Sequence, residues 1–223
     1  MLDRLPGQCE VCRRWGPARL CADCTGRYAA PRPRCRRCAL PLPAGVEVCG
    51  ECLRSAPPFE HTVCVADYAF PWVQLIAAFK FRGRVELAAP LAHELARAAR
   101  ATPAPHWVLP VPLAPGRLAE RGYNQAWEVA RRAARRLGAE ARPDVLRRPR
   151  ETAHQADLPR AERMKNLRAA FVVDAARRAA LQGRRVALVD DVFTTGATAR
   201  EAAITLLAAG AGAVDVWVLA RTP

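Results

Sequence analysis

The fold is indicated most clearly by residues 185–198, which read Arg185-Val-Ala-Leu-Val-Asp-Asp-Val-Phe-Thr-Thr-Gly-Ala-Thr198. Residues 186–189 are an apolar run that is too short for a helix, so they predict a strand covered on both faces. Asp190 and Asp191 follow directly. Ligands bind at the carboxyl ends of strands in open α/β sheets, where adjacent carboxylates can accept the protons of a diol and help to hold a hydrated Mg²⁺. We therefore expect a ligand at this end of the strand.

The next segment is a turn of small and hydroxyl-bearing residues, in the order Thr194, Thr195, Gly196, Ala197 and Thr198. Small residues let backbone N–H groups approach a phosphate, and a helix over residues 198–209 would point its positive end at that anion. This order of groups predicts a site for a ribose and its 5′-phosphate. The alternative is an ordinary helix start, with Thr195 or Thr198 as N-cap and the two aspartates favouring the helix dipole.

Upstream of this stretch, segments with strand patterns alternate with segments of helical periodicity. The patterns predict strands at 63–70, 107–112 and 170–173, and helices at 72–81, 86–100 and 124–137. Such alternation is typical of an α/β fold whose parallel sheet is flanked by helices.

The segment over residues 110–125 combines several prolines with Arg117, Arg121 and a helix start at Asn124. Guanidinium groups match phosphate oxygens in pairs, so one interpretation is a loop that binds a diphosphate, with Asn124 donating to the same anion or capping the helix. The other interpretation is a surface loop whose arginines are solvated.

The first quarter of the chain indicates metal binding. Eight of the nine cysteines form four Cys-x-x-Cys pairs, and Cys64 is left over; the pairs are Cys9/Cys12, Cys21/Cys24, Cys35/Cys38 and Cys49/Cys52. Two such pairs complete one tetrahedral Zn²⁺ site, so we expect two structural zinc ions in successive zinc ribbons, with neighbouring pairs combined. The segment is poor in large aliphatic residues, so the metal would supply its folding free energy. Disulfides or a redox Cys-x-x-Cys are the alternatives; without a signal-peptide pattern we expect a reducing compartment.

Composition limits the class of protein. With 223 residues, 51% of them hydrophobic, the chain can form one α/β domain and a small appendage, and its sequence has no apolar run long enough to span a bilayer. We expect a soluble, cytoplasmic protein without membrane insertion. The net charge of +14 would attract polyanions, including nucleic acid. Compositional bias is an equal explanation, because arginine is abundant while lysine occurs only at Lys80 and Lys165.

A dense polar stretch over residues 147–168 is too long for a simple connector. Its placement and charge suit a lid that closes over a diphosphate. The alternative is a contact with single-stranded DNA, but the stretch has no aromatic residue for base stacking. We assign no catalytic role to its single histidine, His154.

The stretch quoted first closely resembles the phosphoribosyl diphosphate (PRPP) motif of type I phosphoribosyltransferases. The resemblance implies that Asp190 and Asp191 face the ribose hydroxyls. It also implies that PRPP, bound with Mg²⁺, contacts Val192, Thr194, Thr195, Gly196, Ala197 and Thr198. Thr194 stands where purine-salvage members of that superfamily carry an acid that assists the base, which argues against purine salvage.

The whole chain resembles the ComF/GntX family, the competence protein F group. The resemblance rests on several motifs in the same order: the cysteine pairs, Phe79-Lys-Phe81, Pro110-Val-Pro-Leu113, Arg121-Gly-Tyr-Asn-Gln125, Gln155 with Arg163 and Asn166-Leu167, and the PRPP motif. It implies a zinc-binding region at residues 1–57, a phosphoribosyltransferase-like domain at 58–223 and a role in DNA uptake during natural transformation. A helicase of DNA uptake as partner is suggested by the family alone.

Two functions remain open. If the protein is an enzyme, we expect a nitrogen nucleophile to displace diphosphate from C1 of PRPP, with Asp190 and Asp191 holding the ribose and Arg121 steadying the departing diphosphate with Mg²⁺. The alternative is a non-catalytic scaffold in DNA processing, which binds single-stranded DNA or a helicase. The sequence does not identify the acceptor.

Overall fold

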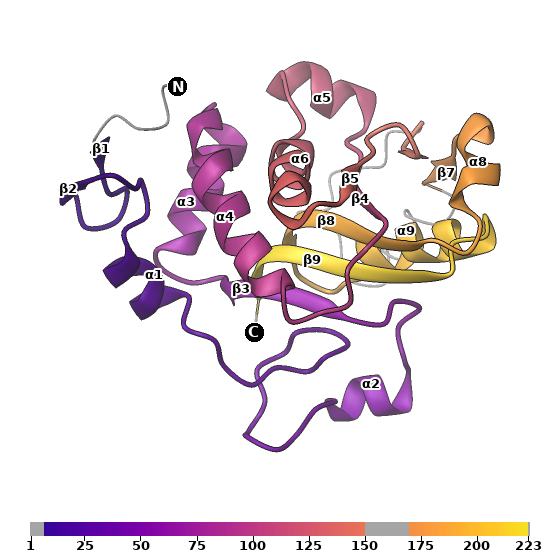
Figure 1. The fold of residues 1–223 in the computed structure, drawn as a ribbon, viewed down its shortest axis with the longest axis horizontal. Helices are drawn as coiled ribbons and strands as arrows, with labels where there is room; N and C mark the ends of the chain where they lie inside the picture. The colour runs from indigo at the N-terminus through magenta and orange to yellow at the C-terminus, as the bar shows by residue number, and fades with distance from the viewer. Residues whose placement is uncertain (1–6, 150–169, 223) are drawn as a thin grey trace.

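The computed structural model describes residues 7–149 and 170–222, and its centre is a parallel sheet (Figure 1). Five strands pair in the order β3-β9-β8-β4-β5, and every neighbouring pair is parallel. Their bounds are β3 Thr62–Asp67, β4 Trp107–Pro110, β5 Glu140–Ala141, β8 Arg185–Phe193 and β9 Ala213–Arg221. The expected α/β fold with a parallel sheet is confirmed, although β9 is not among the predicted strands.

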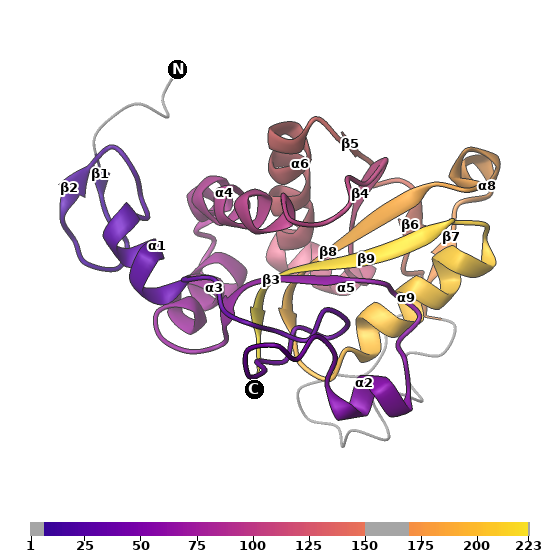
Figure 2. The ribbon, with the colours of Figure 1, turned by 60° about the horizontal axis from the view of Figure 1, so that its bottom comes forward.

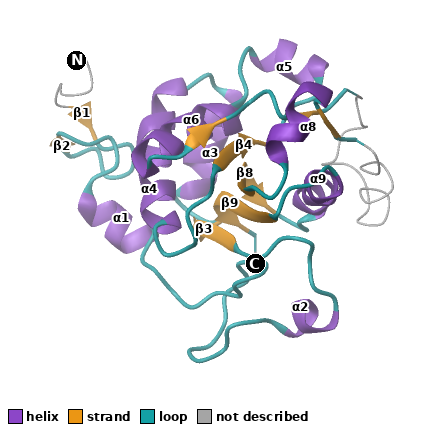
Figure 3. Cartoon of the chain, turned by 45° about the vertical axis from the view of Figure 1, so that its right-hand side comes forward, coloured by secondary structure: helices purple, strands orange, loops and turns teal. Residues whose placement is uncertain are grey.

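Helices cover both faces of the sheet (Figures 2 and 3). One face carries α3 Trp72–Phe81, the 3-10 turn Val85–Leu87, α4 Ala88–Ala99 and α6 Gln125–Leu137. The other face carries α8 Ala175–Leu181, α9 Ala197–Ala208 and the small antiparallel pair of β6 Leu146–Arg147 with β7 Val172–Val173. The crossover connections of a parallel sheet place helices on both faces, which explains why the central strands are apolar almost throughout.

The strand expected at residues 186–189 is longer than predicted. It extends to Phe193 because β9 pairs with it along its whole length, up to the partners Phe193 and Arg221. Asp190 and Asp191 therefore lie within β8 rather than after it. They are nevertheless beyond the end of β4, whose last residue, Pro110, pairs with Val189.

Other boundaries differ by a few residues. The strands expected at 63–70 and 107–112 end at Asp67 and Pro110, and the helix expected from 198 starts at Ala197. The segment at 110–125 contains a short helix that was not predicted, α5 Pro115–Arg121, which ends at Gly122 with a φ of 78°. Left-handed φ values favour glycine, so Gly122 terminates α5.

The cysteine-rich region runs along the β3 edge of the sheet as two separate parts (Figures 1 and 2). Its first part contains the hairpin of β1 Gly7–Gln8 with β2 Trp15–Gly16, followed by α1 Ala22–Tyr28. It packs on the α3–α4 side, where the indole nitrogen of Trp72 donates to the carbonyl of Tyr28 at 2.8 Å. The second part ends in α2 Gly50–Arg54 and contacts β3 and β9.

Some predictions fall outside the described residues. These are most of the proposed lid at 147–168, His154, and the motif residues Gln155, Arg163, Asn166 and Leu167. Among the helices that the structure does describe, none is long and apolar enough to cross a membrane.

The N-cap of α6 supplies a test of the fold. The side-chain oxygen of Asn124 accepts from the backbone N–H of Ala126 at 2.9 Å and of Trp127 at 3.3 Å, and its amide donates to the carbonyl of Val111 at 3.0 Å. Asn124→Ala should lower the free energy of unfolding by about 1–2 kcal/mol in urea titrations. Asn124→Asp keeps the capping acceptor and should lose less; equal losses would contradict the assigned cap.

Candidate functional site

The turn between β8 and α9 is shaped by Gly196. Its φ is 75°, and a Cβ there would lie 2.4 Å from the ring atom Cζ of Phe193. Any larger residue would therefore push the turn away from Phe193. The N-cap position of α9 belongs to Gly196, which has no side-chain cap, and not to Thr195 or Thr198 as the alternative interpretation required. Apart from the N–H of Ala197, which donates weakly to the Thr195 hydroxyl, the first N–H groups of α9 thus remain available to an anion.

A small pocket of about 40 Å³ lies over this turn. Its lining includes Asp190 and Val192 from β8 and all of residues 194–198. The hydroxyl of Thr195 accepts weakly from the N–H of Ala197, at 3.4 Å. Backbone donors, threonine hydroxyls and a helix N-terminus therefore border this space at the turn, which is the chemistry of a phosphate site, while Leu188, Val216 and Val218 contribute apolar lining.

Asp190 joins this small pocket to a larger one. Its half-buried carboxylate accepts from the N–H of Asp191 at 2.8 Å and lines both pockets. Burial, and next the negative charge of Asp191, raise the pKa of Asp190 from 3.8 to about 7. Hydroxyl donors or a cation placed beside this poorly solvated carboxylate would stabilise its negative charge.

Asp191 points to the opposite side of the strand, because successive residues of a strand alternate. It is 5% exposed. Its carboxylate lies 3.0 Å from Nζ of Lys80 on α3 and accepts from the amide of Gln125 on α6 at 3.0 Å. The structure thus surrounds Asp191 with protein partners, while it still contributes to the lining of the larger pocket.

The larger pocket has a volume of about 470 Å³ and is rich in cations. Among the residues at 7–149 and 170–222, the cationic side chains that line it are Lys80, Arg117, Arg121 and Arg148. Arg121 donates to the side chain of Gln125 and lies 5.4 Å from the ring centre of Phe81. Burial, and then the charge of Arg117, lower the pKa of Arg148. A cluster of like charges of this kind favours an anion with several oxygens.

The structure brings the predicted residues together in these two adjoining pockets: Asp190, Asp191, Val192, Thr194 and Thr198 line the larger, and Thr195, Gly196 and Ala197 line the smaller. Arg121 lies across the larger pocket. Lys80, Gln125 and Arg148 also line the larger pocket and are not among the predicted site residues. Lys80 had a detectable signal, because a lysine is rare in a chain that uses arginine almost everywhere.

The cysteines form two clusters, and neighbouring pairs combine as predicted. Within each cluster the four sulfur atoms lie within 4.8 Å of one another; the clusters are Cys9, Cys12, Cys21 and Cys24, and Cys35, Cys38, Cys49 and Cys52. Sulfur–sulfur distances of 3.7 Å in the first and 3.6 Å in the second are close to the edge of a tetrahedron with Zn–S bonds of about 2.3 Å. Both clusters could therefore hold Zn²⁺.

Backbone N–H groups stabilise thiolates in both clusters. Burial alone would raise the pKa of Cys9, but N–H groups such as those of Cys12 and Cys21 bring it down to about 6. The pKa of Cys35 is similarly lowered to about 7, despite burial, by backbone donors that include Cys49. Thiolates are the form that binds zinc, and Cys9 and Cys35 favour that form, whereas burial raises the pKa of Cys24, Cys38 and Cys52. The four sulfur atoms of each cluster are the donor set that fits this metal. Burial raises the pKa of Cys64, which belongs to neither cluster, to about 11.

A third group of ligand-type side chains lies at the other end of the sheet. His61 Nδ1 is 3.0 Å from Asp215, and Glu60 is close by. Arg185 pairs with Asp215 at 2.9 Å and with Glu60 at 2.7 Å. A guanidinium among the carboxylates opposes a metal ion, so this group is an ion-pair network.

Curated proteins resemble the chain over almost its full length. DNA utilization protein YhgH of Escherichia coli (strain K12) is 36% identical over 98% of this chain and 98% of that protein. Competence protein F of Haemophilus influenzae is 34% identical over 91% of this chain and 90% of that protein. No family model matches the chain.

Likeness to solved structures is weaker. The glutamine phosphoribosylpyrophosphate amidotransferase from B. subtilis, complexed with ADP and GMP, is 19% identical and aligns with a TM-score of 0.42. The alignment covers 63% of this chain and 30% of that one. A likeness of this size carries no conclusion about substrate.

The two clusters predict two equivalents of zinc. Metal analysis of the purified protein should give two, and Cys12→Ser and Cys49→Ser should each lose about one, because each removes a ligand from a different cluster. A strong chelator should make residues 7–54 sensitive to protease, since these residues rely on metal rather than on a core. Full protease resistance after complete metal removal would contradict this.

The raised pKa of Asp190 predicts a pH-dependent stability. Between pH of about 4 and about 7 the folded state binds more protons at this carboxyl than the unfolded state, so stability contributed here falls as pH rises. Asp190→Asn removes this carboxyl and with it the loss of stability at higher pH. The variant should therefore raise the free energy of unfolding, relative to the wild type, more at pH 8 than at pH 5, as measured by urea unfolding at both pH values. A difference that does not change with pH would contradict the assignment.

Proposed function

The chain belongs to the family of competence protein F and DNA utilization protein YhgH, and from this premise we propose that it binds PRPP at the end of β8 and acts in DNA uptake. The observation that carries the proposal is the continuity of the two pockets at Asp190. A phosphate-sized space with backbone donors opens into a larger, cation-lined space, and a carboxylate stands between them. PRPP has the same order of groups: 5′-phosphate, ribose diol, diphosphate.

Each part of PRPP has a matching part of the protein. The 5′-phosphate would accept from backbone N–H groups and hydroxyls of residues 194–198 at the start of α9. Asp190 would accept from the ribose hydroxyls. Lys80 lies at the pocket beside Asp191, and with Arg117 and Arg121 it would neutralise the diphosphate.

Mg²⁺ is the metal that the PRPP motif implies. Asp190 is a hard oxygen ligand facing the pocket and would hold a hydrated Mg²⁺ that reaches the protein together with PRPP, whereas Asp191 is already paired with Lys80 and Gln125. When bound, the ion supplies charge neutralisation for the diphosphate. The raised pKa of Asp190 fits this role, because a cation beside the carboxyl favours its charged form.

The reaction that we propose is transfer of the phosphoribosyl group. The bond between C1 and the diphosphate oxygen breaks, a bond from an acceptor nitrogen to C1 forms, and that nitrogen loses a proton. The residues of the site contribute by positioning and by stabilising charge on the departing diphosphate. Thr194 offers a hydroxyl in place of an acid, so the acceptor lies outside purine salvage.

A second candidate is a scaffold that binds single-stranded DNA or a DNA-uptake helicase. The observation that favours it is Phe81, which is 73% exposed at the rim of the larger pocket and has Lys80 and Arg121 close to its ring. An exposed aromatic ring beside cations is the usual platform for an unpaired base. The sequence of the 147–168 stretch contains no such ring.

PRPP binding and turnover test the proposal. Calorimetry with Mg²⁺ should show PRPP binding to the wild type, and Asp190→Asn with Asp191→Asn should weaken it at least about tenfold, since hydrogen bonds to charged groups are lost. Gly196→Ala should weaken it as well, because the added Cβ meets Phe193. Release of diphosphate, measured against a panel of nitrogen acceptors, reports the transfer.

The control variant carries Asp23→Asn and Asp144→Asn, which remove two carboxylates that line neither pocket. It should bind PRPP like the wild type. Binding without diphosphate release for any acceptor would favour the scaffold, and then Phe81→Leu should weaken binding of single-stranded DNA. Failure of PRPP to bind in the presence of Mg²⁺ would refute the site itself.

A further inference from the structure

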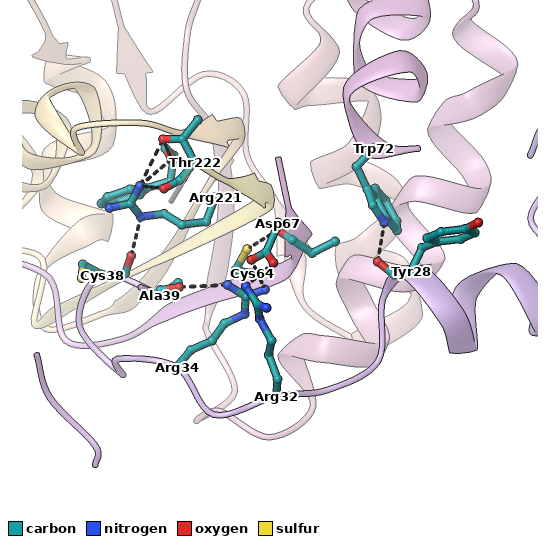
Figure 4. A network of polar contacts seen from close by, with 12 residues as sticks. Tyr28, Arg32, Arg34, Cys38, Ala39, Cys64, Asp67, Trp72, Arg221 and Thr222 are labelled. Carbon is teal, nitrogen blue, oxygen red and sulfur yellow. Dashed lines mark hydrogen bonds and ion pairs between the residues drawn. The ribbon is translucent and has the colours of Figure 1, made fainter. Parts of the chain in front are cut away.

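Arg221, the last residue of β9, connects two regions that are distant in sequence (Figure 4). Its Nε donates to the carbonyl of Cys38, a residue of the second cysteine cluster, at 3.0 Å. Its Nη1 donates to the carbonyl of Phe193 at 3.4 Å and to Thr222. One guanidinium group thus ties the cysteine turn to the end of β8.

Phe193 continues this connection into the phosphate turn. The Arg221 guanidinium lies 5.1 Å from the centre of the Phe193 ring. On the side of the turn, the same ring lies so close to Gly196 that it leaves no room for a Cβ. Thr222 adds a bond from its N–H to the Phe193 carbonyl at 3.1 Å. The position of the ring therefore determines where the turn at 194–198 can lie.

A second contact reinforces the first. Arg37 lies in the same turn as Cys38, and its Nη1 donates to the carbonyl of Phe59 at 2.9 Å. The ring of Phe59 packs edge to face against Phe193, with ring centres 6.1 Å apart. The hydroxyl of Thr62, in β3, also holds this turn by donating to the carbonyl of Arg37. Phe193 is thus held from two sides by one cysteine turn.

We propose that Arg221 is a positioning residue that couples the second cysteine cluster to the phosphate turn. A metal bound by Cys35, Cys38, Cys49 and Cys52 fixes the Cys38 carbonyl, and Arg221 transmits that position to Phe193 and from there to Gly196. Loss of the metal frees the carbonyl, so the ring and the turn lose their support. Coupling of this kind is reciprocal, so an anion on the turn also stabilises the metal-bound cluster.

The first cluster provides an internal comparison. The described contacts of its segment are with other parts of the chain: Glu10 pairs with Arg84 at 2.8 Å, and the carbonyl of Tyr28 accepts from Trp72. We expect metal at the first cluster to have no effect on the phosphate turn.

Hydrogen exchange followed by mass spectrometry tests the coupling without any ligand. In the zinc-loaded protein, Arg221→Gln should raise the exchange rate of residues 193–200 about tenfold, as loss of charged hydrogen bonds would. Arg34→Gln is the matched control. Arg34 donates to the carbonyl of Ala39 in the same cysteine turn, at 3.1 Å, but its other partner is Asp67 and not Phe193. It should leave the exchange of residues 193–200 unchanged.

Cysteine variants test the metal side. Cys49→Ser should raise the exchange of residues 193–200 strongly in the wild-type background and clearly less in the Arg221→Gln background, where only the contact through Arg37 and Phe59 is left to lose, while Cys12→Ser should have no effect there. Equal effects of Cys12→Ser and Cys49→Ser, or an unchanged turn in Arg221→Gln, would overturn the proposal. If Cys49→Ser fails to fold, the comparison of Arg221→Gln with Arg34→Gln, both zinc-loaded, decides it.

A binding measurement links the coupling to the proposed function. Arg221→Gln should weaken the affinity for ribose 5-phosphate about tenfold and leave the affinity for Mg²⁺-diphosphate unchanged, because only ribose 5-phosphate would bind at the turn. Equal loss for both ligands would indicate general damage and overturn the positioning role. If ribose 5-phosphate binds to no variant, the proposed function fails, whereas the exchange result still decides the coupling.

Discussion

The site depends on the pairing of β8 with β9 beyond the end of β4. Pro110 is the last residue of β4 and pairs with Val189, so the next four residues of β8 have β9 as their strand neighbour on one side only. The larger pocket lies on the open side of this overhang, next to Val111 and Pro112, and the smaller pocket lies between the turn at 194–198 and residues of β8 and β9. Asp190 and the turn at 194–198 are presented at a strand end whose backbone is held in place by β9. Without that pairing, neither the carboxylate nor the start of α9 would have a fixed position.

Charge is distributed unevenly around this overhang, and this arrangement limits the ligands that fit. The chain has a net charge of +14, and four of its cationic side chains line the larger pocket with Asp190 and Asp191. Lys80 satisfies Asp191, whereas burial leaves Asp190 with a pKa of about 7. An anion with several oxygens is favoured by the cations, and a diol or a cation is favoured by the carboxylate. The second cysteine-rich segment is connected to the same region, because the carbonyl of Cys38 accepts from Arg221 and Arg221 pairs with Phe193 across β8 and β9.

Local patterns in the sequence predicted most of the fold, and they named residues that the structure brings together in the candidate site, whose role stays a prediction. The apolar run at 186–189, the turn at 194–198 and the spacing of the cysteine pairs each act over a few residues, so their chemistry is visible in the chain. The position of Lys80 beside Asp191 was not visible, because it depends on how α3 packs against the end of β8. The length of β8 was underestimated for a similar reason: Asp190 and Asp191 lower strand propensity, and the pairing with β9 overrides it.

A crystal structure of the protein with ribose 5-phosphate tests the central claim most directly. We expect the phosphate on the backbone N–H groups of residues 194–198, with the ribose hydroxyls directed at Asp190. A sugar phosphate bound elsewhere, for example on the arginines of α6, with the turn at 194–198 left to solvent, would contradict it.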